Sequence, residues 1–184
     1  MIKYAKIINN ETGLCEVGTG TNTAFYKSIG MVETDVEQSD VNGNWYLSEL
    51  CPKKSDEEKL EEAKQAKIQE NDLKRDETLN QGVKYKGVLF DSDTDQKVNL
   101  LAIVSTLGDE DIITWYGKDN QPLECSKEDL INIGSFITQL HTFCWNKNAE
   151  IKALINDAET LEEVNNIVID YTIVKGAENA VNIQ

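Results

Sequence analysis

The residues best suited to catalysis are a histidine and a cysteine in the second half of the chain. His141 is the only histidine in the sequence, and Cys144 follows three residues later. Residues three apart lie on one face of a helix, and this face is predicted to be apolar. A nucleophile and a base placed in this way have a poor geometry for a catalytic triad. We therefore expect His141 to lie in the core or at its edge, with no catalytic role.

Two other patterns could hold a metal ion. Asp91-Ser92-Asp93-Thr94-Asp95 resembles the start of a calcium loop, but Gln96 and Ala102 stand where that loop needs Gly and Glu. A turn that caps a helix explains the same residues, because Asp favours both. A zinc site would need two further soft ligands beside the histidine and Cys144, and Cys125 is the one candidate. We expect no metal site.

A glycine-containing segment begins like a dinucleotide-binding fingerprint. Gly18 and Gly20 have the right spacing, but Thr23 stands where the third glycine belongs and no βαβ unit follows. The sequence contains no GxxxxGK[ST], GxSxG or HExxH motif. Pairs of carboxylates are plentiful, and they cannot be told from a solvated surface. We expect no cofactor and no catalytic residues, so the protein is predicted not to be an enzyme.

The charge of the chain argues against two classes of partner. Its 184 residues include 18 Lys and Arg and 33 Asp and Glu, which gives a net charge of −15. Nucleic acids and anionic membrane surfaces both require a basic face. No run approaches the ~20 apolar residues of a membrane span, and Met1-Ile2-Lys3-Tyr4 does not begin a classical secretory signal. The 4 cysteines are too sparse for a disulfide scaffold, so we expect them to be free and mostly buried.

The pattern of charge and turns predicts an α+β fold in several parts. Residues 1–52 are interpreted as a small N-terminal β-rich docking unit. Residues 53–81, of which more than half are charged, are interpreted as a charged helical connector. Residues 82–175 are expected to form a C-terminal α+β domain, and residues 176–184 a loose tail.

Short strands and one short helix are predicted for the N-terminal unit. Extended segments at 3–8, 14–17 and 31–36 surround a helix that passes through Phe25 and ends near Ile29. Asn42-Gly43 is the strongest hairpin signal, because both central residues of a type I′ turn need positive φ.

Capping boxes predict where three later helices begin. They are Ser55-x-x-Glu58, Ser126-x-x-Asp129 and Thr160-x-x-Glu163. The first helix, which runs to Asn80, has too few apolar residues to bury deeply. We interpret it as an exposed charged helix or, alternatively, as a weak coiled-coil stalk.

The C-terminal domain contains the clearest apolar pattern of the sequence. Residues 83–91 are interpreted as a strand or, alternatively, as a hairpin about Lys86-Gly87, and residues 112–125 as a hairpin. A helix is expected over 96–107, and its apolar face would consist of Leu100, Leu101, Ile103, Val104 and Leu107. The helix behind Ser126 keeps a spacing of three to four between its apolar residues, with one break at Lys147. These residues are Leu130, Ile133, Ile137, Leu140, Cys144, Ile151 and Leu154, and the stripe is widened by Phe136, Phe143 and Ile155. Such a stripe must be covered by its own domain or by another subunit, and the sequence leaves both open.

Three adjacent pairs of aromatic residues are the candidate interaction sites. They are Phe25-Tyr26, Trp45-Tyr46 and Trp115-Tyr116. Neighbours on a strand point to opposite faces, so one residue of a pair can enter the core while the other is displayed to a partner. Burial of both residues of a pair is the alternative.

Two parts of the chain resemble phage proteins. Residues 4–9, 25–31, 35–38 and 43–47 resemble the start of small tail proteins of phages and phage-like contractile tails of clostridia-like bacteria. Residues from about 60 to 170 are similar to an uncharacterised domain common in phage tail-fibre-associated proteins. The marks of that domain are residues 87–91, 114–115, 119–123 and 155–158.

The resemblance implies a structural component of a phage or phage-like tail, at the baseplate or tail-fibre region, that acts by protein–protein binding. Its partners would be other tail, baseplate or tail-fibre proteins, or further copies of itself. It would lie in the tail particle, and in the bacterial cytoplasm during assembly. One alternative is a tail-fibre assembly chaperone that is absent from the mature particle, since a high negative charge suits a soluble holder. A second alternative is a hydrolase of cell wall or glycan.

Overall fold

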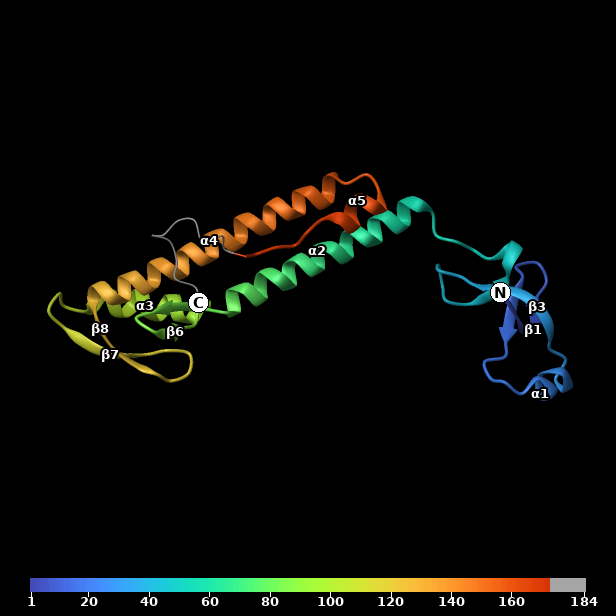
Figure 1. Cartoon of the computed structure of the whole chain (residues 1–184), viewed down its shortest axis with the longest axis horizontal. Coiled ribbons are helices and arrows are strands. Elements are labelled where there is room, and N and C mark those ends of the chain that lie inside the picture. The colour runs from blue at the N-terminus through green and yellow to red at the C-terminus, as the bar shows by residue number, and fades with distance from the viewer. Residues whose placement is uncertain (173–184) are drawn as a thin grey trace. The chain divides into compact units, whose positions relative to one another are not determined.

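The computed structural model describes residues 1–172, and its fold class is α+β as predicted. The chain forms two compact units, with unit 1 spanning Met1–Glu61 and unit 2 beginning at Glu62. Each unit is described by itself (Figure 1). The predicted tail at 176–184 lies outside the described residues.

Unit 1 is a small antiparallel barrel with the strand order β1-β2-β4-β3. The core contains Ala5, Cys15 and Val36, and Val17, Trp45 and Leu47 pack against it. Because the barrel is closed, its strands leave no free edge for another chain. The elements of unit 1 are β1 (Ile2–Asn9), β2 (Leu14–Val17), α1 (Thr23–Ser28), β3 (Val32–Gln38), β4 (Trp45–Leu47) and the 3₁₀ turn η1 (Ser48–Leu50).

The turn between β3 and β4 differs from the one predicted. A type I′ turn needs positive φ at both central residues, but of Asn42 and Gly43 only Gly43 has it, at 74°. The Ser39 N–H donates to the Asn44 carbonyl (2.8 Å), so the loop is longer than two residues. The Asn42 side chain accepts from the Asn44 N–H (3.0 Å) and so shapes the loop itself. The predicted hairpin is therefore confirmed, and the predicted turn type is wrong.

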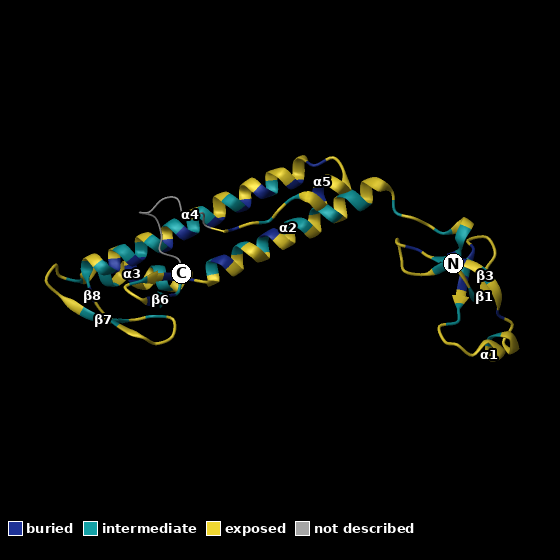
Figure 2. Cartoon of the chain, in the orientation of Figure 1, coloured by how far each residue is buried: buried dark blue, intermediate teal, exposed yellow. Residues whose placement is uncertain are grey.

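Unit 2 combines helices with two antiparallel hairpins. Its core is formed by residues of both hairpins and of the helices, and buried residues are dark blue in Figure 2. The elements are α2 (Asp56–Asn80), β5 (Val83–Tyr85), β6 (Val88–Phe90), α3 (Thr94–Thr106), β7 (Ile112–Tyr116), β8 (Pro122–Ser126), α4 (Lys127–Asp157) and α5 (Leu161–Asn166). All three predicted capping boxes are present.

The apolar stripe of α4 is the centre of this core and is covered within the one chain. The buried residues follow a spacing of three to four along the whole helix. They are Leu130, Ile133, Ile137, Leu140, Cys144, Asn148, Ile151 and Ile155. Two details differ from the prediction. Asn148 fills the break in the apolar pattern, and Leu154 is 53% exposed, whereas Ile155, expected only to widen the stripe, is buried.

Helix α2 differs from a free connector. From Glu62 onward it is part of unit 2, where it lies antiparallel beside α4 (Figure 1). The Lys64 ammonium donates to the Asn156 carbonyl (2.8 Å), and Asn71 is fully buried against Asn148. The predicted connector at 53–81 is therefore divided between the two units.

The second predicted helical face, that of α3, is only partly buried. Leu100 is 3% exposed and lies in the core of unit 2, with Ile103, Val104 and Leu107 packed against that core. Leu101, which the apolar pattern also placed on the buried face, is 73% exposed. A helix that contacts the core along one side buries positions three and four apart, which Leu100, Ile103, Val104 and Leu107 occupy, and Leu101 lies outside this stripe.

The α4 stripe leads to a prediction about stability. Replacing Leu140 by Ala removes a side chain that is 1% exposed, and we expect the free energy of unfolding to fall by about 2–5 kcal/mol. Leu154→Ala is the matched control, since it is the same change on the same helix at an exposed position. Urea unfolding followed by circular dichroism measures both variants. Equal losses for the two variants would contradict the assignment of the core.

Candidate functional site

The first predicted aromatic pair lies on α1 of unit 1. Phe25 is 53% exposed, whereas Tyr26 stacks on Tyr4 with 6.1 Å between ring centroids. The Tyr26 hydroxyl accepts from the Gly20 N–H (2.5 Å). A Cβ at Gly18 would lie 2.7 Å from the Tyr26 ring, so the glycine there is required by close packing. The two glycines that resembled a dinucleotide loop are thus explained by their contacts with the Tyr26 side chain.

The second pair lies on β4, and both of its rings are covered. Tyr46 is buried, and its hydroxyl accepts from the Asn42 side chain (3.0 Å). Trp45 is half-buried against the core of unit 1, with the Lys3 ammonium 4.2 Å from its ring centroid. Burial of both residues, the alternative reading of the sequence, describes this pair better than display.

The third pair divides between two faces of the β7–β8 hairpin. Trp115 packs against the core of unit 2, and Tyr116 is 60% exposed. This division follows from the alternation of side chains along a strand. Among the six predicted interaction residues, the structure therefore displays Phe25 on unit 1 and Tyr116 on unit 2.

His141 joins three elements of unit 2. Its Nε2 lies 2.6 Å from the Ser92 carbonyl, and its Nδ1 lies 2.9 Å from the Lys97 ammonium. Since a carbonyl only accepts and an ammonium only donates, these partners place the imidazole proton on Nε2. The Ser92 hydroxyl in turn donates to the Leu79 carbonyl at the end of α2. The histidine thus connects α3 and α4 with the end of α2.

The cysteines and the aspartate-rich segment have structural roles in this arrangement. All four cysteines are free, and burial raises the pKa of the Cys144 thiol to about 11. The Asp93 side chain caps α3 by accepting from the Gln96 N–H (2.7 Å). Within residues 1–172 no group of three or more potential metal ligands comes together, and no helix there has the length and apolarity to cross a bilayer.

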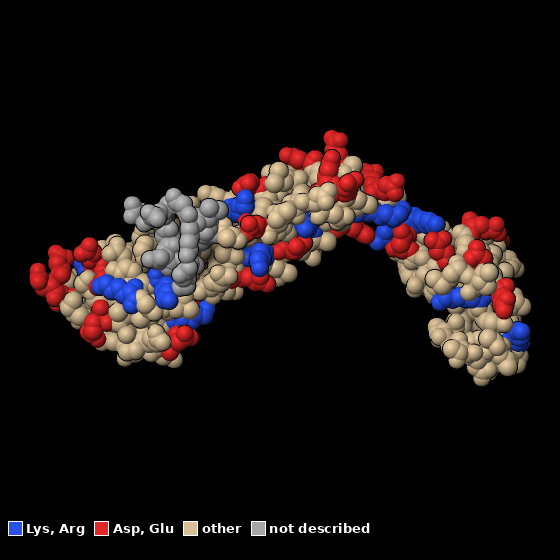
Figure 3. Space-filling view, in the orientation of Figure 1, with Lys and Arg blue, Asp and Glu red and all other residues tan. Residues whose placement is uncertain are grey.

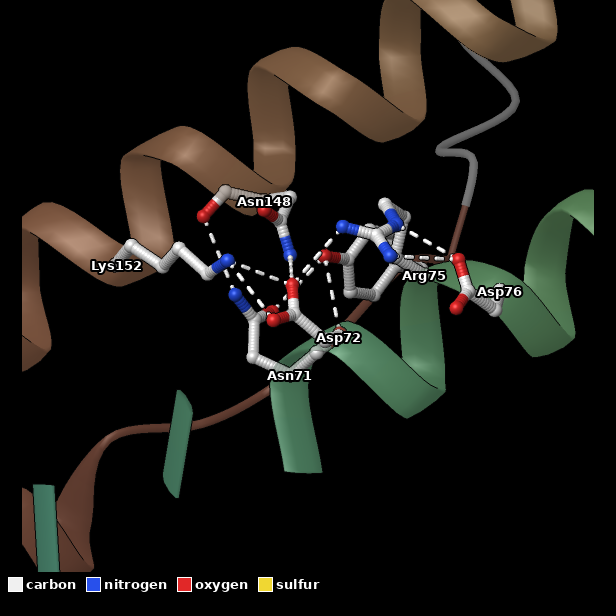
Figure 4. A network of polar contacts seen from close by, with 7 residues as sticks. Asn71, Asp72, Arg75, Asp76, Asn148 and Lys152 are labelled. Atoms are coloured by element: carbon white, nitrogen blue, oxygen red, sulfur yellow. Dashed lines mark hydrogen bonds and ion pairs between the residues drawn. The ribbon is translucent and has the colours of Figure 1, made fainter. Parts of the chain in front are cut away.

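A polar network between α2 and α4 is the most developed cluster of unit 2 (Figure 4). The Asp72 carboxylate accepts from the Asn148 amide (2.9 Å) and pairs with the Lys152 ammonium (2.7 Å). Asn71 donates to the Asn148 carbonyl (3.2 Å). Burial raises the pKa of Asp72, but the bonds from Lys152 and Asn148 and the charge of Arg75 outweigh it and hold that pKa below its usual value.

The extended segment after α5 completes this network. Side chains at 167, 169 and 171 alternate inward, and the segment lies between α2 and α4 in Figure 1. The Tyr171 hydroxyl donates to the Asn71 side-chain oxygen (2.9 Å), and its ring meets Phe143 edge-on. The Arg75 guanidinium covers the Trp145 ring at 4.5 Å. These contacts fasten three segments that are far apart in the sequence.

The sequence-based search missed this network. Hydrophobic periodicity does not detect an interface whose residues are Asn, Asp, Arg and Lys. One signal was available, because Asn148 stands in the gap of the apolar stripe between Cys144 and Ile151.

A second polar cluster lies at the start of α4. The Asp129 carboxylate accepts from the Tyr85 hydroxyl (2.6 Å) and pairs with the Lys86 ammonium (2.7 Å), and it also accepts from the Ser126 N–H (3.1 Å). The bond from Lys86 and then that from Tyr85 hold the pKa of Asp129 well below its ordinary range. The β5–β6 hairpin is thereby fixed to the capping box.

A surface depression of about 390 Å³ lies beside these hairpins. The lining is mixed in polarity, with no paired acid and base among its residues. It is lined by Gln81, Gly82, Lys84, Gly87, Leu89, Asp119 and Gln121.

The α2–α4 network predicts the effect of removing one hydroxyl. Tyr171→Phe leaves the buried oxygen of Asn71 without its donor, and we expect the free energy of unfolding to fall by about 1–3 kcal/mol. Tyr116→Phe is the matched control, since that tyrosine is exposed and its hydroxyl has no partner among residues 1–172. Urea unfolding measures both changes, and a neutral Tyr171→Phe would contradict the assigned bond.

The Asp129 cluster predicts a dependence of stability on pH. A carboxyl whose pKa is lower in the folded state stabilises fully above its unfolded pKa, about 3.9, and loses this contribution as the pH falls through the folded pKa. We expect Asp129→Asn to be less stable than the wild type at pH 7 by about 1–3 kcal/mol. This difference should shrink below about pH 4.

Urea unfolding at several pH values between 2 and 7 measures the difference between the two proteins. Glu128→Gln is the control, because it removes the neighbouring exposed carboxylate of the same helical turn. A difference for Asp129→Asn that stays constant with pH would contradict the role assigned to the carboxylate.

Comparison with known proteins identifies one family. No match is found among curated proteins, and none among solved structures. The model of a family described as a domain of unknown function, DUF4376, matches residues 62–172, which is more than half of the chain. The match begins where unit 2 begins and ends with the last described residue. The matched range also agrees with the uncharacterised domain that the sequence predicted over about 60–170. The chain belongs to the DUF4376 family.

Proposed function

We propose that this protein is a structural component of a phage or phage-like tail, at the baseplate or tail-fibre region, and that it acts by binding other proteins. The resemblance of residues 4–47 to small tail proteins and of residues 60–170 to a tail-fibre-associated domain supports the proposal. Membership of DUF4376 agrees with the second resemblance in extent, and its name carries no function.

One structural observation carries the proposal, namely that each of the two units has its own core and displays a large aromatic residue. In unit 1 this residue is Phe25, 53% exposed, and in unit 2 it is Tyr116, 60% exposed. Trp145 of unit 2 is also 53% exposed, but the Arg75 guanidinium lies over its ring. Displayed aromatic residues are common anchors of protein interfaces. Unit 1 would dock one partner, and unit 2 would dock another or a further copy of the chain.

The second candidate is a tail-fibre assembly chaperone that leaves before the particle is complete. The observation that favours it is the net charge of −15, which keeps a transient holder soluble. Acidic side chains lie over both units on the face drawn in Figure 3, with basic side chains scattered between them. The two candidates share the same binding surfaces and differ in whether the protein remains in the particle.

Quantitative mass spectrometry of purified tails distinguishes the two candidates. A structural component is expected at a fixed ratio to the sheath and baseplate proteins. Absence from tails, together with abundance in the lysate of producing cells, would overturn the structural role and favour the chaperone.

Single substitutions in unit 1 test whether display of an aromatic residue matters. We expect Phe25→Ala to lower incorporation into tails severalfold without loss of folding, because the side chain is 53% exposed and lies outside the core of unit 1. Val41→Ala is the control, since Val41 is also apolar and 53% exposed. Incorporation of both variants is measured by the same mass spectrometry, and equal incorporation would remove Phe25 from the interface.

A further inference from the structure

The hydrogen-bond pattern of the β7–β8 hairpin determines which main-chain groups point outward. The Gly117 N–H donates to the Gln121 carbonyl (2.9 Å) and closes the hairpin. Hydrogen-bonded pairs alternate with non-bonded pairs in an antiparallel ladder, so Trp115 and Leu123 form the next bonded pair. The N–H and C=O groups of Ile112, Thr114 and Tyr116 therefore point away from β8.

These outward groups form an open edge. Among residues 1–172, the main-chain groups of Ile112, Thr114 and Tyr116 have no hydrogen-bond partner. Their side chains are exposed as well, Ile112 to 59% and Tyr116 to 60%. The strand sequence Ile-Ile-Thr-Trp-Tyr has high β propensity and contains no charge, Pro or Gly. Natural sheets normally block such an edge with one of these residues.

The opposite edge of the hairpin is blocked in this way. Pro122 has no N–H to offer, and the Ser126 N–H donates to the Asp129 carboxylate (3.1 Å). Only Glu124, which carries a charge, has a free outward N–H on β8. The contrast between the two edges makes β7 the strand of this hairpin that is able to accept another.

We propose that β7 pairs antiparallel with β7 of a second copy of this chain, with Thr114 on the twofold axis. In this register every outward N–H of one strand meets an outward carbonyl of the other. Ile112 lies opposite Tyr116 of the second copy, and Ile113 lies opposite Trp115 of the second copy. Pairs of a β-branched and an aromatic residue are among the favourable cross-strand pairs.

The charges at the two ends of β7 favour the same arrangement. Asp109, Glu110 and Asp111 precede the strand, and Lys118 follows it. Asp109 pairs with Lys127 (3.1 Å) and Asp111 accepts from the Gly108 N–H, whereas Glu110 has no partner among residues 1–172. Antiparallel pairing places Glu110 near Lys118 of the second copy, whereas parallel pairing would bring the acidic ends together. Within its own chain the Lys118 ammonium already pairs with Asp91 (3.0 Å) and donates to the Asn80 carbonyl (2.7 Å), so the charge argument concerns the polarity of the two strand ends.

The size of the full chain in solution tests the proposal, measured by light scattering up to the highest soluble concentration. Wild type is expected to approach twice the monomer mass. Thr114→Pro removes an outward N–H and leaves the main-chain bonds of the hairpin in place, although the side-chain bond to Glu124 (2.7 Å) is lost, so we expect this variant to stay monomeric.

Glu124→Pro is the matched control. It makes the same change on the opposite edge and also removes the bond between Thr114 and Glu124 (2.7 Å), so it should dimerise like the wild type. A monomeric wild type would overturn the proposal, and so would dimers of equal strength in both variants. Binding of a foreign extended peptide at β7 by a monomeric wild type would assign the edge to a different partner.

Cross-linking tests the register and does not require proline in a strand. Directly opposed residues of a bonded pair have Cα atoms about 5.5 Å apart, within the range of a disulfide. Thr114→Cys is expected to form a covalent dimer under mild oxidation, whereas Glu124→Cys is expected to stay monomeric. Equal cross-linking of the two variants would overturn the register. The result is independent of the role proposed for the protein in tails.

Discussion

The contact on which unit 2 depends is the one between the carboxylate of Asp72 on α2 and the groups that α4 offers to it. Helix α2 has no continuous apolar stripe, so hydrophobic burial alone cannot hold it against α4. The Asn148 amide and the Lys152 ammonium supply directed bonds to the carboxylate, and Asn71 returns one to the backbone of α4. Because such bonds have short reach, they allow one register of the two helices. That register in turn places the Asn71 side chain where it accepts from the Tyr171 hydroxyl (2.9 Å).

The features that follow from local rules could be predicted from the sequence. The capping boxes, the Lys86-Gly87 turn with φ of 46° and 84°, and the α4 stripe each depend on residues close together in the chain. The pairing of α2 with α4 could not be predicted, because its polar residues are typical of a solvated helix. Of the candidate site, the alternation at Trp115-Tyr116 was predictable from strand geometry. The covered state of Trp45 depends on Lys3, which is distant in the sequence.

The only histidine shows how a residue type common in catalytic sites can serve a structural role. A search for chemistry begins with His141, yet its two nitrogens are occupied by the Ser92 carbonyl and the Lys97 ammonium. This arrangement ties the start and first turns of α3 to α4, and the Ser92 hydroxyl carries the connection to α2. The polar residues that stand out in the sequence of unit 2 thus serve mainly to position helices.

The two units treat the edges of their strands differently, and this bears on why the sequence has no sharp functional motif. Unit 1 closes its strands into a barrel. In unit 2 the Lys118 N–H donates to the Leu89 carbonyl on the outer side of β6. At the end of β8 the Ser126 N–H donates to the Asp129 carboxylate in the capping box of α4. Under the proposal made for β7, recognition rests on the main chain along that strand, and main-chain groups are the same in every residue. A protein that binds through a strand edge needs particular residues only where an edge must be blocked. Its sequence therefore shows which edges are blocked more clearly than it shows which edge binds.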